Sequence, residues 1–244
     1  MRRYDTVIVG SGFYSFGYAA AHPNTLIVEE THLTDRHFSG CLRGFSCANK
    51  PLNAPIAKAL AAYMGEHGIV RGNQICVPAL EAGLCAFFAD RTFDVLLGTT
   101  CMEIERSGEE YRLSLCNNEG LSNVAAKRVI DTRVYGGNVL NVLVQGGIDN
   151  IVQGISVDDA FYNEQKILSL YFENGVDINR AKSEAYPRLR ELLTPTGATV
   201  LQMAYRMYNA EPTAPFTDDK GILRIDESFF GDPFTAFEKG ELQQ

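Results

Sequence analysis

The stretch Thr6-Val7-Ile8-Val9-Gly10-Ser11-Gly12-Phe13-Tyr14-Ser15 decides the fold. Its apolar run predicts a buried strand, and the two glycines predict a tight turn into a helix. The pattern Gly-x-Gly-x-x-Ser is a variant of the dinucleotide-binding fingerprint, in which the second glycine lets the backbone approach a pyrophosphate. Free N–H groups and the helix dipole favour phosphate there. The candidate binding residues of this turn are therefore Gly10, Ser11, Gly12, Tyr14 and Ser15.

Two carboxylates strengthen this interpretation. Residues 25–28 predict a second buried strand, and Glu29 and Glu30 follow it directly. A carboxylate at this place accepts hydrogen bonds from ribose hydroxyls and repels a 2′-phosphate, which favours FAD or NAD over NADP. The alternative is a glycine turn in an ordinary α/β protein.

Composition excludes several classes of partner. The net charge is −8 in 244 residues, whereas nucleic acids and anionic membranes reward clustered Lys and Arg. No run approaches the roughly 20 apolar residues of a membrane span, and the N-terminus lacks a signal-peptide pattern. The six cysteines form no Cys-x-x-Cys pair, so we expect reduced thiols and no metal site. These features together predict a cytoplasmic protein.

The remaining pattern predicts an α/β fold. We expect a Rossmann-like FAD/NAD(P)-binding domain (residues 1–135 and 220–244) and a small, mostly helical second region (136–219) for substrate or interface contacts. The predicted helices are 54–65, 77–90, 157–174 and 178–193, with a short helix at the C-terminus. Residues 198–209 suit either a strand or a helix, and we favour a helix. The predicted later strands are 94–97, a three-stranded antiparallel meander (101–105, 111–116 and 123–130) and 221–225.

The order of these elements resembles the FAD-dependent oxidoreductases of the glutathione-reductase structural class. Residues 78–131 are similar, more narrowly, to the bacterial FAD-dependent oxidoreductase family, and the resemblance as a whole covers 4–45, 76–133 and 221–241. It implies FAD as the cofactor, with the backbone of Cys101 at the adenine end. The return strand of that family ends in Ala-Thr-Gly, whereas this chain has Asp131-Thr132-Arg133. Asp131 and Thr132 are retained as candidates, although the glycine is replaced by arginine.

Two further segments carry candidate residues. Gly231-Asp232-Pro233-Phe234-Thr235 resembles the Gly-Asp that precedes the last helix of the family, which implies that Gly231, Asp232, Phe234 and Thr235 contact the flavin end. An Asp that caps a helix before Pro is the equally natural reading. The loop after the second strand supplies Arg36, Ser39, Gly40, Cys41 and Arg43, of which the arginines suit phosphate. The resemblance also places His37 or Cys41 near the flavin ring, and covalent attachment of FAD through a histidine of this loop stays open, although we favour a solvent-exposed His37.

The leading hypothesis is an FAD-dependent oxidoreductase that transfers hydride from a small organic substrate to flavin. The chain is short for this class, so we expect a homo- or hetero-oligomer that completes the site. A non-catalytic FAD- or NAD-binding subunit of a larger complex is the alternative, and an enzyme similar to thiazole synthase is a third reading. No catalytic residue can be assigned from the sequence.

Overall fold

A mixed eight-stranded sheet forms the centre of the protein, whose computed structural model describes residues 1–44, 51–90, 93–133, 136–148 and 154–243. Its strand order is β13-β14-β8-β1-β2-β5, and β14, β8, β1, β2 and β5 run parallel. The strands are β1 (Arg2–Val9), β2 (Thr25–Val28), β5 (Asp94–Leu96), β8 (Gly120–Asp131), β13 (Phe216–Thr217) and β14 (Leu223–Arg224). The two buried strands predicted before and after the glycine turn are thereby confirmed as β1 and β2.

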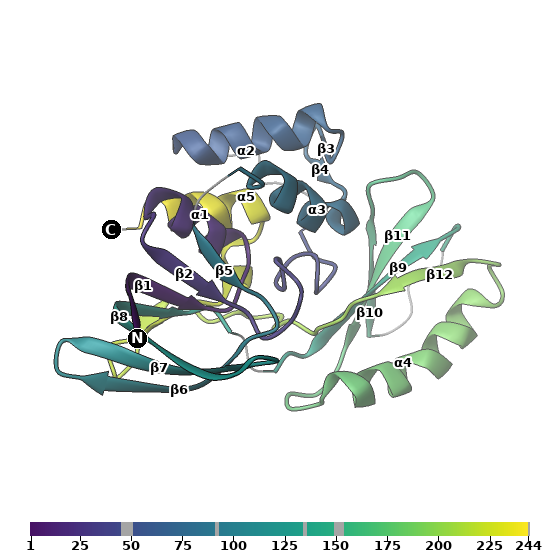
Figure 1. Cartoon of the computed structure of the whole chain (residues 1–244). Coiled ribbons are helices and arrows are strands. Elements are labelled where there is room, and N and C mark those ends of the chain that lie inside the picture. The colour runs from purple at the N-terminus through teal and green to yellow at the C-terminus, as the bar shows by residue number, and fades with distance from the viewer. Residues whose placement is uncertain (45–50, 91–92, 134–135, 149–153, 244) are drawn as a thin grey trace.

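The predicted three-stranded meander is confirmed. It comprises β6 (Thr100–Ser107), β7 (Glu110–Asn117) and the first half of β8, which pair antiparallel. Strand β8 is long enough to pair with β7 early and with β1 later. The meander therefore extends the edge of the parallel sheet, as Figure 1 shows at the lower left.

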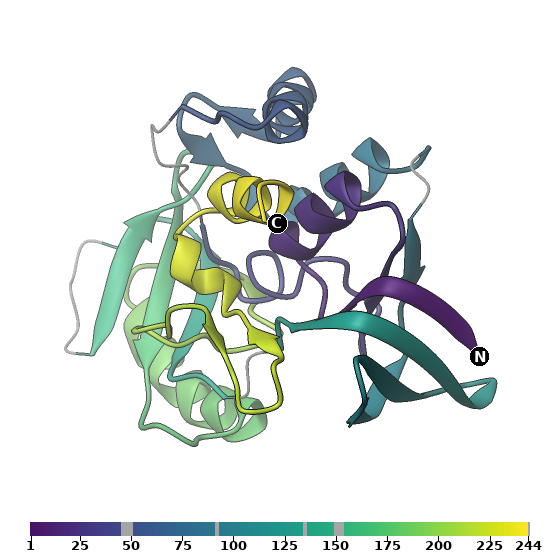
Figure 2. The same cartoon turned by 90° about the vertical axis from the view of Figure 1, so that its left-hand side faces the viewer.

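Helices cover one face of this sheet (Figure 1). They are α1 (Phe13–Ala21), α2 (Pro55–Glu66), α3 (Val77–Phe87) and α5 (Pro233–Glu241). The short hairpin of β3 (Val70–Arg71) and β4 (Gln74–Ile75) joins α2 to α3. Helices α1 and α5 lie side by side in both Figure 1 and Figure 2. A Cβ added to Gly17 would lie 2.1 Å from the carbonyl oxygen of Phe237, so glycine permits this close contact.

A second, four-stranded sheet follows the meander. It is antiparallel with the order β10-β11-β9-β12, and its strands are β9 (Val139–Gln145), β10 (Ile155–Asp159), β11 (Gln165–Tyr171) and β12 (Thr199–Met203). Helix α4 (Ile178–Leu193) runs beside this sheet (Figure 1). Buried Ala181, Ala185 and Leu189 of α4 join the same hydrophobic core as the strands.

The prediction of a mostly helical second region was wrong. Residues 157–174 contain the end of β10 and all of β11, and residues 198–209 contain β12. Short apolar runs such as Ile167–Leu170 do not separate strand from helix by periodicity, and pairing with neighbouring strands decided the outcome. The helix at 178–193 is confirmed with the same bounds. The division of the chain at residues 135 and 220 stays a prediction.

The last described elements are the 3-10 helix η1 (Glu227–Phe230) and α5. Helix η1 follows β14 directly, so it starts at the carboxyl edge of the parallel sheet. None of the helices in the described ranges is long and apolar enough to cross a bilayer.

Candidate functional site

The carboxyl end of β1 is the switch point of the parallel sheet. Strand β1 lies between β2 and β8, and ligands of open parallel sheets bind in the crevice at such a point. Gly10 has a φ of +104°, and a Cβ there would lie 2.4 Å from the hydroxyl oxygen of Thr132. Ser15 donates a hydrogen bond of 3.1 Å to the Gly10 carbonyl. Thr132 and Ser15 thus pack closely on the glycine turn, and the turn is tight as the fingerprint predicts.

Glu29 is fully buried at the end of β2. Its carboxylate accepts hydrogen bonds from the Ser11 N–H at 3.0 Å and the Thr31 N–H at 2.9 Å. Arg36 lies 3.3 Å from the same carboxylate and 3.2 Å from that of Glu30. Ser11, Glu29, Glu30 and Arg36, all predicted site residues, therefore form one hydrogen-bonded cluster.

Glu30 is the exposed member of this cluster. Its side chain is 38% exposed, and Arg206 of the second region pairs with it at 2.7 Å. Partial burial raises the pKa of Glu30, but the hydrogen bonds and charges of Arg206 and Arg36 outweigh it and lower the pKa overall. Glu30 is therefore ionised and ties the edge of the main sheet to the second region.

The loop 31–44 folds around a buried aspartate that the sequence did not single out. Asp35 accepts hydrogen bonds from the backbone N–H groups of His37, Phe38 and Ser39 at 2.8–3.2 Å, and from the Ser39 hydroxyl at 2.8 Å. Burial raises the pKa of its carboxyl, although these bonds oppose the shift. The predicted site residue Ser39 thus serves to hold the loop.

His37 is buried rather than exposed, which corrects the sequence-based expectation. Its side chain forms a hydrogen bond with the Thr132 backbone, and its Nε2 has no partner among the described residues. Burial and then the charges of Arg36, Arg206 and Arg43 lower the pKa of His37 well below its ordinary value. The imidazole is therefore neutral beside the glycine turn.

Cys41 is also buried, and its Sγ contacts the carbonyl oxygens of Arg36 and Met207. Burial, followed by the charge of Asp35, raises the pKa of this thiol to about 12. A thiol in this state is a poor nucleophile. Covalent attachment of a cofactor through Cys41 thus has no chemical support, and Cys47 lies outside the described residues.

Arg43 stacks over the ring of Tyr208, with its guanidinium carbon 4.7 Å from the ring centre. Its Nη1 has no hydrogen-bond partner in the described parts of the chain, and burial lowers its pKa. The carbonyl of Gly40 accepts the N–H groups of Tyr205 and Arg206, at 2.8 and 3.1 Å. The loop that carries Gly40, Cys41 and Arg43 is therefore fastened to the second region.

At the other side of the turn, arginine takes the place of the expected glycine. Arg133 pairs with Asp131 at 2.7 Å and donates to the carbonyl of Cys101 at 3.4 Å. Asp131 is also paired with Arg224. Arg133 therefore engages the Cys101 backbone that was expected at the adenine end.

The Gly231-Asp232 element caps a helix. Asp232 accepts hydrogen bonds from the N–H groups of Phe234 and Thr235, both at 3.0 Å, and from the Thr235 hydroxyl at 2.7 Å. Gly231 has a φ of +84°, which suits glycine in the turn before it. The capping interpretation is confirmed, and a contact of this element with a cofactor stays a prediction.

Glu227 is a second site residue that sequence reasoning missed. Its carboxylate accepts hydrogen bonds from the Tyr14 N–H at 3.2 Å and the Ser15 hydroxyl at 3.3 Å. A Cβ added to Gly12 would lie 2.4 Å from it, so the carboxylate fills the space above this glycine. Burial, followed by the charge of Asp35, raises the pKa of Glu227 to about 8. Nothing in its run Asp226-Glu227-Ser228 indicates such a position.

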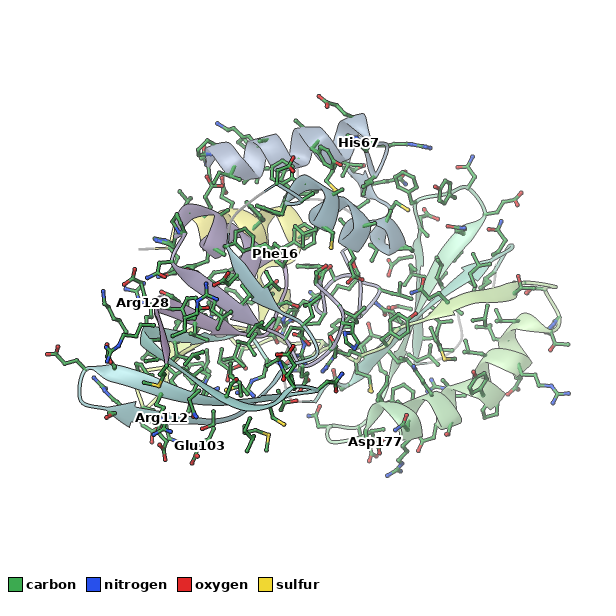
Figure 3. The ribbon with its side chains drawn as sticks, viewed as in Figure 1. Phe16, His67, Glu103, Arg112, Arg128 and Asp177 are labelled. Carbon is green, nitrogen blue, oxygen red and sulfur yellow. The ribbon has the colours of Figure 1, made fainter. Side chains whose placement is uncertain are left out.

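A cavity of about 710 Å³ opens between the loop 31–44 and the second region. Its volume is in the range of small-molecule sites. The loop contributes Arg36, His37 and Cys41, the segment before α4 contributes Asp177, and Asp226 and Ser228 flank Glu227 along the chain. Figure 3 shows Asp177 at the start of α4. The described residues include no cluster of potential metal ligands.

Comparisons with known proteins identify the fold. No family model and no curated protein matches the chain. Solved structures do: p-nitrophenol 4-monooxygenase PnpA from Pseudomonas putida (11% identity, 92% of this chain and 72% of that one, TM-score 0.57) and glycine oxidase from Geobacillus kaustophilus (12%, 99% and 92%, 0.57). A third is the flavin-dependent monooxygenase PieE in complex with FAD and substrate (13%, 91% and 52%, 0.56). The chain therefore has the Rossmann-type fold of FAD-binding flavoproteins.

Proposed function

We propose that the chain is an FAD-dependent oxidoreductase that transfers hydride from a small organic substrate to the flavin. The observation that carries this proposal is the joining of three features: the glycine turn at the switch point, the carboxylates after β2 and a cavity of about 710 Å³ that starts beside them. The structural likeness to PieE, which was solved with FAD, supports the choice of FAD over NAD.

Several of the described residues at the glycine turn fit FAD. The N–H groups at the start of α1 suit phosphate, Glu29 and Glu30 stand where ribose hydroxyls are recognised, and the unpartnered Nη1 of Arg43 suits an anion. Glu227 does not fit in its present position, because its carboxylate lies at those N–H groups and has to move before phosphate enters. Bound FAD would supply the hydride acceptor, while the chain supplies orientation and charge.

The experiment is direct. We expect the purified protein, as isolated or after incubation with FAD and removal of free ligand, to show the visible absorption spectrum of a flavoprotein. Mass measurement of the ligand released by denaturation identifies it and separates FAD from NAD. A colourless protein that takes up no added FAD would contradict the proposal.

The proposal includes an oligomer. Among the described residues, the second region contributes one four-stranded sheet and one helix to the substrate side of the cavity. We propose that a second copy or another subunit completes that side. We expect light scattering to give a mass above that of one chain. A monomer with full activity would contradict this part.

A non-catalytic FAD- or NAD-binding subunit is the second candidate. The observation that favours it is the pairing of Arg133 with Asp131 and the Cys101 carbonyl, which occupies groups expected at the adenine end. This candidate predicts bound dinucleotide that no tested substrate reduces. Anaerobic spectra recorded with panels of small alcohols, amines and hydroxy acids distinguish it from the oxidoreductase, for which at least one substrate bleaches the flavin.

A further inference from the structure

The N-terminus of α1 is capped by a side chain from near the other end of the sequence. Gly12 provides no side-chain cap for this helix. Instead the Glu227 carboxylate accepts the Tyr14 N–H at 3.2 Å and the Ser15 hydroxyl at 3.3 Å, directly above Gly12. We use the name phosphate seat for Gly12, the Tyr14 N–H and the Ser15 hydroxyl at the start of α1. A carboxyl group of the chain's own therefore takes the place that the fingerprint offers to a ligand's phosphate.

Placing the Glu227 carboxylate in the phosphate seat costs free energy. Its side chain is fully buried, and no ion pair joins it to a cation within the described ranges. The charged group that acts on it is Asp35, which repels it. The partial positive charge of the helix N-terminus offsets only part of the cost of burying a carboxylate, because that charge is about half a unit.

The surroundings of the turn suit an incoming anion. His37 lies on the Thr132 backbone beside Gly10, is 5% exposed, and its Nε2 lacks a partner among the described residues. The positive charges that act on His37 are those of Arg36, Arg206 and Arg43. A phosphate near the turn would meet this donor-capable ring and these arginines in addition to the helix.

We propose that Glu227 is a built-in competitor for the phosphate seat, and that it sets the affinity of the protein for phosphate-bearing ligands. In the free protein its carboxylate caps α1, and a pyrophosphate group binds once the side chain swings away. Asp226 and Ser228, the neighbours of Glu227 along the chain, line the cavity, and the proposed movement carries the side chain toward it. With FAD as the ligand, the inference rests on the proposed function.

The test compares Glu227→Ala and Glu227→Gln with the wild type, using two probes. One probe is FAD, followed by quenching of its fluorescence, and the other is inorganic pyrophosphate, followed by calorimetry. We expect Glu227→Ala to lower the Kd of both probes about tenfold, equivalent to about 1.4 kcal/mol, with Glu227→Gln in between. The matched control is Glu119→Gln, an exposed acid in the turn between β7 and β8, which should change neither Kd. Circular dichroism verifies that each variant is folded.

Each outcome decides between the two proposals. Tighter binding of both probes supports both. Tighter binding of pyrophosphate without FAD binding by any variant keeps the competitor role and overturns the proposed function. Equal Kd values for FAD in the wild type and both variants overturn the competitor role and keep the proposed function. Folded proteins that bind neither probe overturn both.

Discussion

Helices α1 and α5 pack against each other, yet they begin in different ways. Helix α5 carries its own cap, Asp232, which accepts the N–H groups of the next turn at 3.0 Å. Helix α1 has glycine at the equivalent place and borrows the carboxylate of Glu227, which lies 213 positions from Tyr14 along the chain. A local cap is fixed by the backbone that carries it, whereas a borrowed carboxylate can leave while the helix start remains intact.

Helix α2 shows that borrowing alone does not make a ligand site. It also lacks a side-chain cap of its own, and Glu241 of α5 accepts the N–H groups of Ile56 at 2.9 Å and Ala57 at 2.7 Å. Glu241 is partly exposed, whereas Glu227 is fully buried above a glycine and beside Asp35. The difference between the two helix starts therefore lies in burial and charge, and it can be tested by substitution.

The largest expected effect is a stabilisation of the free protein by Glu227→Gln at high pH. Tyr14 and Asp35 are the titratable neighbours coupled to Glu227 in the described structure, and neither supplies a positive charge. The folded-state pKa of Glu227, about 8, lies above its ordinary value of 4.5, so the folded chain binds more protons between these values and loses stability as pH rises through them. Glutamine does not ionise, and its advantage should reach the order of 5 kcal/mol near pH 9.

Denaturant unfolding at several pH values between 5 and 9 measures this effect. The difference in unfolding free energy between Glu227→Gln and the wild type should be small near pH 5 and grow up to about pH 8. Glu119→Gln should show no such trend. A difference that is constant with pH would mean that Glu227 is ionised throughout and is stabilised by groups other than those described.

The second effect is a loss of stability in Asp232→Ala. Removing an N-cap side chain costs about 1–2 kcal/mol, and Asp232 is a buried cap that holds three hydrogen bonds. Thermal unfolding should show a lower Tm, and Asp232→Asn should recover most of it because asparagine also caps. Loss of FAD binding in a stable Asp232→Asn variant would instead indicate a direct contact with the cofactor.

The third effect, in Glu241→Gln, is expected to have the opposite sign to that of Glu227→Gln. The Glu241 carboxylate accepts two short hydrogen bonds at α2, and charge-assisted bonds at a helix N-terminus are stabilising. Replacing it should cost about 1 kcal/mol near neutral pH, measured by the same denaturant unfolding. Stabilisation by this variant would remove the distinction between the two borrowed carboxylates.

The sequence predicted the parts of the site that depend on neighbours along the chain. The glycine turn, the carboxylates after β2 and the capping role of Asp232 follow from spacing within a few residues, and the structure contains the same arrangement. Glu227 could not be found in this way, because its partners are contributed by α1 at the opposite end of the chain. Asp35 was missed for a related reason: its role comes from the burial of a loop without regular structure.

The prediction for the second region failed for a different reason. Its strands are short, and β11 mixes polar and apolar residues in a pattern that also suits a helix face. The run Val139–Val144 has the β-branched, apolar character of a central strand and would have indicated β9. A strand at β9 needs neighbouring strands to pair with, and the runs around Val157 and Ile167 were the available ones.

The smallest expected effect concerns a second local cap, Asp177 at the start of α4. It accepts the N–H groups of Asn179 at 2.9 Å and Arg180 at 3.1 Å, as Asp232 does at α5, but these bonds are exposed to solvent. Water replaces an exposed cap in part, so Asp177→Ala should cost about 0.5 kcal/mol, at the low end for N-caps. Denaturant unfolding of Asp177→Ala beside Asp232→Ala measures how much burial adds to the same local motif. Equal losses in the two variants would show that burial adds nothing to a helix cap. The difference between Glu227 and the other helix caps would then come from its charge alone.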